Sequence, residues 1–145
     1  MMQKSLKKMS FIFIVITILS CNSPKPTIED ITGVWVSQEG ATLTFKKDAK
    51  IDIEDYPLYL ANNTFEGKYD GYGTWSISDS KVSSLFWKID IVSKGVGKTQ
   101  LINNGLAIEL LVSRSGFGGS SSEITSLFIW KGDPDADNRY EFKKQ

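Results

Sequence analysis

The sequence contains no histidine and only one cysteine, Cys21, among its 145 residues. Without histidine, neither a Ser-His-Asp nor a Cys-His catalytic arrangement can form, and the usual His/Cys zinc sites are excluded as well. A lone cysteine also rules out an internal disulfide. Because these absences remove much of hydrolytic and metal-dependent enzymology, we expect a protein that is not an enzyme and that uses no cofactor or metal.

The sequence also lacks a strong excess of either charge. Three of its 17 basic side chains lie before residue 21, so residues 21–145 carry 14 basic and 17 acidic groups, a net charge of −3. Nucleic-acid-binding domains usually carry a basic patch or stripe, and so do proteins that bind anionic lipid. We therefore expect no nucleic-acid partner, and we expect any membrane attachment to be covalent.

No apolar run reaches the ~18 residues that a membrane-spanning helix requires. The longest, FIFIVITIL at residues 11–19, follows the basic residues Lys4, Lys7 and Lys8 and ends directly before Ser20 and Cys21. A basic stretch followed by a short apolar one is the pattern of a secretory signal. The alternatives are a retained N-terminal anchor, or an ordinary secretory signal followed by a chance cysteine.

The residues Ile18-Leu19-Ser20-Cys21 resemble the lipobox of bacterial lipoproteins, with isoleucine in place of the usual leucine. This resemblance implies cleavage between Ser20 and Cys21, so that residues 1–20 are a removed signal peptide. It also implies a diacylglycerol on Cys21, commonly with a further acyl chain such as palmitate, and a single chain would bind a membrane only marginally. The expected location is the bacterial cell envelope. Because Asn22 is not the aspartate that marks inner-membrane retention in some bacteria, the outer membrane is favoured.

Residues 21–32 contain two of the four prolines and several small polar residues, which predicts a flexible, solvated tether after the lipidated cysteine. Within it, Thr27 and Asp30 have the spacing of a helix-capping pair. The remaining residues, 33–145, are enough for one domain.

From residue 33 onward, apolar and polar residues alternate with a period of two, as in antiparallel strands that bury one face. Asn104-Gly105 is a strong signal for a hairpin turn. The pattern predicts an all-β, up-and-down meander that closes into a small barrel, with a two-sheet sandwich as the alternative. The predicted strands are residues 33–37, 41–46, 50–54, 73–78, 84–92, 98–102, 106–113, 125–131 and 139–143.

The first predicted strand contains Gly33-Val34-Trp35, which resembles the Gly-x-Trp motif of lipocalin-like, calycin-type barrels. In those barrels the tryptophan closes one end and commonly packs against an arginine from late in the chain. The resemblance implies a barrel closure formed by Gly33, Trp35 and Arg139, in which the arginine stacks on the Trp35 ring. The alternative is that Trp35 is an ordinary core residue, since Gly73-Thr74-Trp75 repeats the motif.

The longest predicted connection, residues 55–72, holds four of the five tyrosines. Tyrosine combines a large contact area with a hydroxyl group and is favoured at interfaces. We expect this loop and two tryptophans of the barrel to contact a ligand or a partner; the alternative is a loop that folds back and plugs the barrel mouth. The candidate contact residues are Tyr56, Tyr59, Phe65, Tyr69, Tyr72, Trp75 and Trp87.

Two further segments resemble binding loops only in part. Asp133, Asp135 and Asp137 alternate as in a calcium loop, but Asn138 stands where that loop needs glycine, so a hairpin turn is favoured. Residues 115–122 are glycine-rich but lack the lysine and the following helix of a phosphate-binding loop, and we expect a surface connection there.

Four acids, Asp52, Glu54, Asp55 and Asp70, lie close in sequence, and paired carboxylates can hydrolyse glycosides. The alternation places Asp52 and Glu54 on the solvated face of their strand, which does not favour catalysis. The sequence therefore predicts a lipid-anchored, non-enzymatic binding module for a small apolar ligand. The alternative is a periplasmic protein-interaction module, of inhibitor or immunity type, that binds through residues 55–72.

Overall fold

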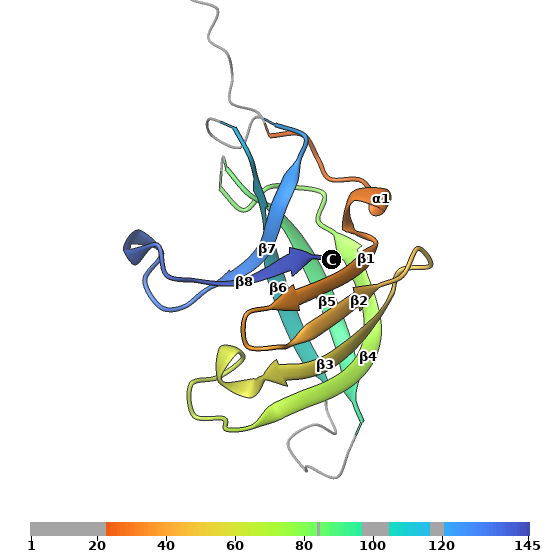
Figure 1. Cartoon of the computed structure of the whole chain (residues 1–145), viewed down its shortest axis with the longest axis vertical. Coiled ribbons are helices and arrows are strands. Elements are labelled where there is room, and N and C mark those ends of the chain that lie inside the picture. Colours follow the sequence, from red (N-terminus) through yellow and green to blue (C-terminus); the bar gives the residue numbers. More distant parts are fainter. Residues whose placement is uncertain (1–22, 84, 97–104, 117–120) are drawn as a thin grey trace, which may run out of the picture.

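The computed structural model describes residues 23–83, 85–96, 105–116 and 121–145. These residues form eight antiparallel strands, each paired with its neighbour in the chain, and β1 pairs with β8 to close a barrel (Figure 1). The predicted all-β meander and its closure into a barrel are confirmed. The strands are β1 (Gly33–Ser37), β2 (Thr42–Phe45), β3 (Lys50–Pro57), β4 (Lys68–Ile77), β5 (Trp87–Gly95), β6 (Leu106–Arg114), β7 (Ile124–Trp130) and β8 (Arg139–Lys144).

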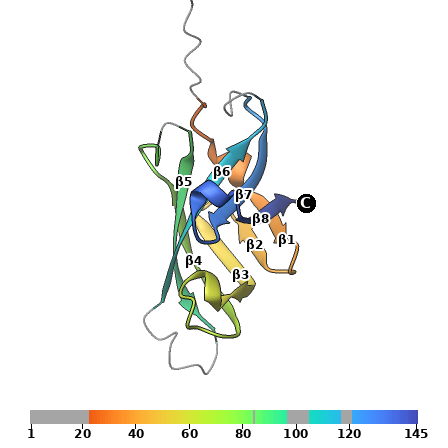
Figure 2. The same ribbon diagram turned by 90° about the vertical axis from the view of Figure 1, so that its left-hand side faces the viewer.

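The described helical segments are short and lie at the edges of the barrel. The helix α1 (Ile28–Ile31) sits at one end, and the 3₁₀ turn η1 (Leu58–Leu60) lies in the β3–β4 connection at the other (Figures 1 and 2). A second 3₁₀ turn, η4 (Pro134–Ala136), joins β7 to β8. We call the two ends of the barrel the α1 end and the η1 end.

The predicted loop at residues 55–72 is mostly strand, which corrects the sequence interpretation. β3 continues to Pro57 through a register shift between Ile53 and Tyr56, and β4 already begins at Lys68. The bulge residue Asp55 has a φ of 54°, and it interrupts the alternation on which the prediction depended. The actual connection is residues 58–67.

Two inward-facing glycines explain why the sequence pattern did not predict the first half of β4. Tyr69, Gly71, Gly73 and Trp75 alternate along one face of the strand, but the two glycines supply no apolar signal. The backbone of β5 passes so close to Gly73 that an added Cβ would lie 2.0 Å from the Val92 carbonyl oxygen. Glycine is therefore needed there for close strand approach.

The strand predicted at residues 98–102 and the residue Asn104 lie outside the described residues. The described partners of β6 are β5, where Leu106 pairs with Ser93, and β7. β5 extends to Gly95, three residues further than predicted, and Gly105 has the positive φ, 79°, that a glycine tolerates.

Inward-facing side chains from all eight strands pack into a hydrophobic core. Among its fully buried members are Trp35, Phe45, Tyr56, Tyr69 and Phe142. Aromatic rings of this size fill the inside of a small barrel, because eight strands leave a lumen only about as wide as their side chains.

The N-terminal segment that leads to the barrel contacts it at several points, although many of its residues are exposed. The side chains of Ser23 and Pro26 are buried, the Trp87 Nε1 donates a hydrogen bond to the Ser23 carbonyl (2.9 Å), and Arg114 donates to the Pro24 carbonyl (3.0 Å). The expected flexible tether is thus corrected at Ser23 and Pro24, whose backbone carbonyls accept hydrogen bonds from side chains of the barrel.

The predicted capping pair is confirmed. The Asp30 backbone N–H donates to Thr27 Oγ1 (3.2 Å) and the Thr27 N–H donates to Asp30 Oδ2 (2.8 Å), which together form a capping box for α1. The helix directs Ile31 into the core, where it is fully buried.

The predicted signal peptide, residues 1–20, and the predicted cleavage and lipidation site at Ser20 and Cys21 lie outside the described residues. Within the described part of the chain, no helix is long and apolar enough to cross a bilayer.

Candidate functional site

Trp35 is fully buried next to α1, and its cationic partner is Lys144. Its buried Nε1 donates to the Ile31 carbonyl (2.8 Å), and the Lys144 Nζ lies 5.6 Å from the ring centroid. Trp35 pairs directly with Lys144 across β1 and β8, whereas Arg139 begins β8 five residues earlier, about 17 Å along the strand. The predicted Trp35–Arg139 contact is therefore corrected.

Arg139 belongs to an aromatic cluster on the outside of the barrel. Its guanidinium carbon lies 4.5 Å from the Phe128 ring centroid and 4.7 Å from that of Trp130, and the Phe86 ring completes the cluster. Asp137 Oδ1 lies 2.9 Å from the Arg139 Nε, which makes an ion pair without hydrogen-bond geometry. This cluster was not predicted from the sequence. The unbroken apolar run at residues 127–130 is the signal that could have revealed it, because such a run indicates burial on both faces.

Tyr69 plugs the η1 end of the barrel interior. Its hydroxyl lies 2.8 Å from Ser93 Oγ, which in turn donates to the Leu106 carbonyl (3.0 Å). The ring occupies the space above Gly71, where an added Cβ would lie 2.6 Å from the tyrosine side chain. Burial raises the pKa of Tyr69, although its hydrogen bond with Ser93 acts in the opposite direction. For this residue the structure agrees with the alternative expectation of buried rings.

The other predicted contact residues do not form one site. Trp75 and Trp87 lie at the α1 end, where their Nε1 atoms donate to the Lys46 and Ser23 carbonyls. Phe65 packs against the core from the β3–β4 connection, and the Tyr59 hydroxyl donates to Glu39. The residue that remains on the outside is Tyr72, which is 55% exposed.

The wall of the barrel opens between β6 and β7 toward the η1 end. The described pairs between these strands stop at Leu111 and Phe128, beyond which Ile129 and Trp130 pair only with β8. A depression of about 380 Å³ lies across this gap, and we call it the β6–β7 slot. It is lined by Tyr56, Leu60, Ala61, Val82, Lys88, Ala107, Ile108, Glu109, Leu111, Ile129 and Trp130.

The slot has an apolar floor with one hydroxyl group. Tyr56 and Ile108 face inward and belong to the core, yet both line the depression through the gap in the wall. Burial raises the pKa of Tyr56 above its usual range, so its hydroxyl stays neutral and can donate a hydrogen bond. Such a combination of apolar lining and a few polar groups is typical of small-ligand sites.

The rim of the slot is charged but internally paired. The Lys88 Nζ lies 2.9 Å from both Glu109 Oε1 and Asp90 Oδ1, and these hydrogen bonds raise the pKa of Lys88. The ammonium of Lys88 is thereby held by two carboxylates, and the three side chains together carry a net charge of −1, which does not favour an anionic ligand.

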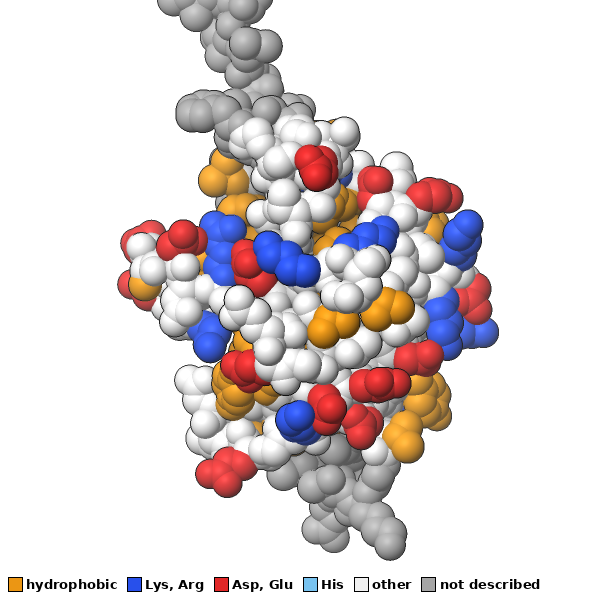
Figure 3. Space-filling model, in the orientation of Figure 1, with side chains coloured by type: hydrophobic (Ala, Val, Ile, Leu, Met, Phe, Trp, Pro, Cys, Tyr) orange, Lys and Arg blue, Asp and Glu red, His pale blue; other side chains and the backbone are white. Residues whose placement is uncertain are grey.

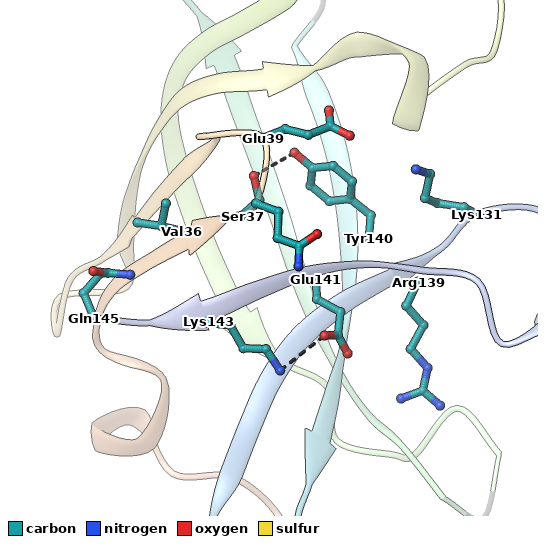
Figure 4. A pocket seen from close by; sticks show the side chains of 10 residues that line it. Val36, Ser37, Glu39, Lys131, Arg139, Tyr140, Glu141, Lys143 and Gln145 are labelled. Atoms are coloured by element: carbon teal, nitrogen blue, oxygen red, sulfur yellow. Dashed lines mark hydrogen bonds and ion pairs between the residues drawn. The ribbon is translucent and has the colours of Figure 1, made fainter.

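A second depression, of about 380 Å³, lies over β1 and β8 and has a mainly polar lining. Figure 4 shows Tyr140 pointing toward Ser37, to which it is hydrogen bonded (2.8 Å), and Lys143 paired with Glu141 (3.2 Å). Arg139 extends away from this group (Figure 4). Because its polar groups are largely used by one another, this depression is the weaker candidate for an apolar ligand.

The four acids of the sequence analysis lie on the outer face of β3 and β4. Asp52 pairs with Lys46 (2.6 Å), and Asp70 accepts a hydrogen bond from the Asp55 N–H (2.8 Å). Figure 3 shows a row of acidic side chains on this side of the molecule, with exposed hydrophobic side chains beside it. Among the described residues, no three acidic or cysteine side chains converge as a metal site would require.

Residues 133–138 form the predicted turn between β7 and β8. The Asp133 side chain accepts a hydrogen bond from the Asp135 N–H (3.0 Å) and caps η4, while Asp137 adopts a left-handed conformation. The Lys131 N–H donates to the Asn138 carbonyl (2.8 Å) and closes the connection. Of the glycine-rich stretch at residues 115–122, residues 117–120 lie outside the described part.

An eight-stranded antiparallel meander with an apolar interior fits a lipocalin-like fold. No protein-family model matches the chain, and neither a curated protein nor a solved structure matches it significantly. The function therefore has to be argued from the geometry of the barrel.

Proposed function

We propose that this protein is a lipid-anchored, non-enzymatic lipoprotein of the bacterial cell envelope that binds a small apolar ligand in the β6–β7 slot. The observation that carries the proposal is the depression over the gap in the barrel wall, whose lining includes the core residues Tyr56 and Ile108. The slot volume of about 380 Å³ falls within the ~300–1,000 Å³ typical of ligand pockets.

We place the proposed ligand in the slot and not in the interior of the barrel. The interior is occupied by rings such as Trp35 and Tyr69, and neither Trp75 nor Trp87 is among the residues that line the slot. In the slot, the ligand would pack on Leu60, Ile108 and Ile129 and receive one hydrogen bond from the Tyr56 hydroxyl. A flat, uncharged molecule with a single group that can donate a hydrogen bond to a hydroxyl, or accept one from it, matches this lining best.

Binding can be measured with the uncharged fluorescent probe N-phenyl-1-naphthylamine. Ala107 is exposed and lines the slot, so Ala107→Trp fills the depression without touching the core. We expect it to weaken probe binding at least tenfold. Ala136→Trp, at an exposed alanine in η4, is the matched control and should bind as the parent protein does. Equal probe affinity of the parent and Ala107→Trp would contradict the proposal.

The lipid anchor is proposed on the lipobox-like residues Ile18-Leu19-Ser20-Cys21. Intact-mass measurement of protein extracted from its own membranes tests it. We expect a chain that starts at Cys21 and carries the added mass of a diacylglycerol and an acyl group. A chain that retains residues 1–20, or that carries an unmodified cysteine, would refute the anchor.

A protein-interaction module is the second candidate, and the exposure of Tyr72 favours it. Tyr72 lines a depression of about 500 Å³ on the acidic outer face, together with Asp55, Asp70 and Val96. A photo-crosslinking residue in place of Tyr72 would capture a specific protein in the native cells. The same residue in place of the exposed Thr125, on β7, should capture none.

A further inference from the structure

The α1 end carries an apolar groove beside the point where the chain enters the described structure. The groove has a volume of about 400 Å³, and we call it the α1 groove. It is lined by Lys25, Pro26, Thr27, Ile28, Ala49, Trp75, Ser76 and Ile77. Its most exposed large apolar side chain is Ile28, at 47%.

The position of Ser23 restricts how far Cys21 can lie from this end. Ser23 is buried and is held by the hydrogen bond from Trp87, and the next residue is held by Arg114. Because consecutive Cα atoms are 3.80 Å apart, the Cα of Cys21 lies at most ~7.6 Å from that of Ser23. A lipid attached to Cys21 must therefore lie close to the barrel.

We propose that the α1 end of the barrel, with the α1 groove and Ile28, is a lipid-contact face that rests in the headgroup layer of the membrane to which Cys21 is attached. This inference rests on the proposed lipidation of Cys21. The headgroup layer of one leaflet is ~5–8 Å thick, which is comparable with the reach from Ser23 to Cys21. A lipid inserted at Cys21 therefore brings the groove to the level of the headgroups.

The side chains of this face suit that environment. The Lys25 Nζ lies over the Trp87 ring, 5.7 Å from its centroid, and pairs with the exposed Asp79 (3.1 Å), so the ammonium sits at the border between an aromatic ring and solvent. Trp75 lines the groove with its indole nitrogen bonded to the Lys46 carbonyl. Tryptophan and lysine are enriched at membrane–water interfaces for the same reason.

Attachment fixes the orientation of the molecule as well. With the α1 end against the lipid, the η1 end and the acidic outer face around Tyr72 point away from the membrane. The opening of the β6–β7 slot lies on the side of the barrel and remains accessible from the periplasmic space or the medium.

The test exploits Cys21 as the sole cysteine. The chain from Cys21 onward contains every described residue of the barrel, and it can be coupled through Cys21 to a maleimide lipid in phosphatidylcholine vesicles at low surface density. Hydrogen–deuterium exchange with mass spectrometry then compares coupled protein with protein whose cysteine is capped. We expect exchange at residues 25–32 and 46–49 to slow several-fold on coupling, while residues 58–67 exchange as before.

Two variants sharpen the result. Ile28→Asp should lose most of the slowing, whereas Tyr72→Asp, which changes an exposed apolar residue away from the α1 end, should retain it. A Gly/Ser insert of about 12 residues between Asn22 and Ser23, which spans ~17–21 Å, should also abolish the slowing.

The lipid-contact face is overturned if coupling at the native spacing does not slow exchange, or if it slows exchange at residues 58–67 instead. It is also overturned if the slowing grows with surface density, because that is the behaviour of a contact between copies of the protein. Because the coupling is chemical, this experiment is independent of whether cells lipidate Cys21. The intact-mass measurement answers that question separately, so the two failures are distinguishable.

Discussion

The hydroxyl of Tyr69 on β4 lies 2.8 Å from the Ser93 Oγ on β5, and this contact closes the η1 end of the barrel interior. Both residues are almost fully buried. The tyrosine that the sequence suggested as a ligand contact is thus a structural plug, and the ligand site proposed here lies beside it in the wall of the barrel.

Removal of the Tyr69 hydroxyl tests this role. Tyr69→Phe and Ser93→Ala should each lower the free energy of unfolding by ~0.5–1.5 kcal/mol, because each breaks the buried hydrogen bond between the two side chains. Urea unfolding of both variants and of the double variant measures the coupling. Strictly additive effects would show that the two groups do not interact.

Gly73 should not tolerate even alanine. An added Cβ would lie 2.0 Å from the Val92 carbonyl oxygen and 2.6 Å from the Ser93 Cα, so β4 and β5 would have to separate. We expect Gly73→Ala to lower the unfolding free energy by ~1–3 kcal/mol or more, as overpacking does. Thr74→Ala, at the exposed neighbouring position, is the control and should change it far less. Comparable effects at the two positions would refute the close approach.

Tyr56 should make stability depend on alkaline pH. Burial raises its pKa in the folded state above the 10.0 of an unperturbed tyrosine, so the unfolded chain ionises first. The contribution of Tyr56 to stability is therefore complete below pH 10 and is lost as the pH rises above it. Unfolding free energies between pH 8 and 11.5 should fall less steeply in Tyr56→Phe than in the parent protein. An unchanged slope would contradict the burial of this hydroxyl.

Arg139 should not be replaceable by lysine. Its planar guanidinium packs against both the Phe128 and Trp130 rings, and lysine retains the charge but not the planar contact. We expect Arg139→Lys to lower the free energy of unfolding by ~0.5–2 kcal/mol and to shift the emission of Trp130. Equal stability of the two proteins would show that charge alone matters at this position.

The strand pattern could be predicted where one face of a strand is apolar and the other polar, as in β2 and β8. The prediction was wrong where a bulge at Asp55 interrupts the alternation, and where Gly71 and Gly73 occupy inward positions without an apolar side chain. The glycines allow β4 to approach β5 closely, and the bulge shifts the register of β3 against β4; both are relationships between strands that a local pattern does not contain.

The β6–β7 slot could not be predicted from the sequence. It lies where β6 and β7 are not paired with each other, although each of them is a regular strand. Its lining comes from β3, the β3–β4 connection, the β4–β5 connection, β5, β6 and β7, and the closeness of Tyr56 to Ile129 follows from the closure of the barrel. The docking of Ser23 and Pro24 on the barrel was missed for a related reason. Its hydrogen bonds use backbone carbonyls of Ser23 and Pro24, which leave no signature in the side chains.

The most direct test of ligand binding in the slot is a methyl NMR titration with N-phenyl-1-naphthylamine. We expect shift changes confined to methyl groups that line the slot, those of Leu60, Ile108 and Ile129. The methyl groups of Ile51 and Ile89, which are buried in the core but do not line the slot, should hardly move. Shift changes centred on Ile28 and Ile77 in the α1 groove, or none at saturating probe, would contradict it.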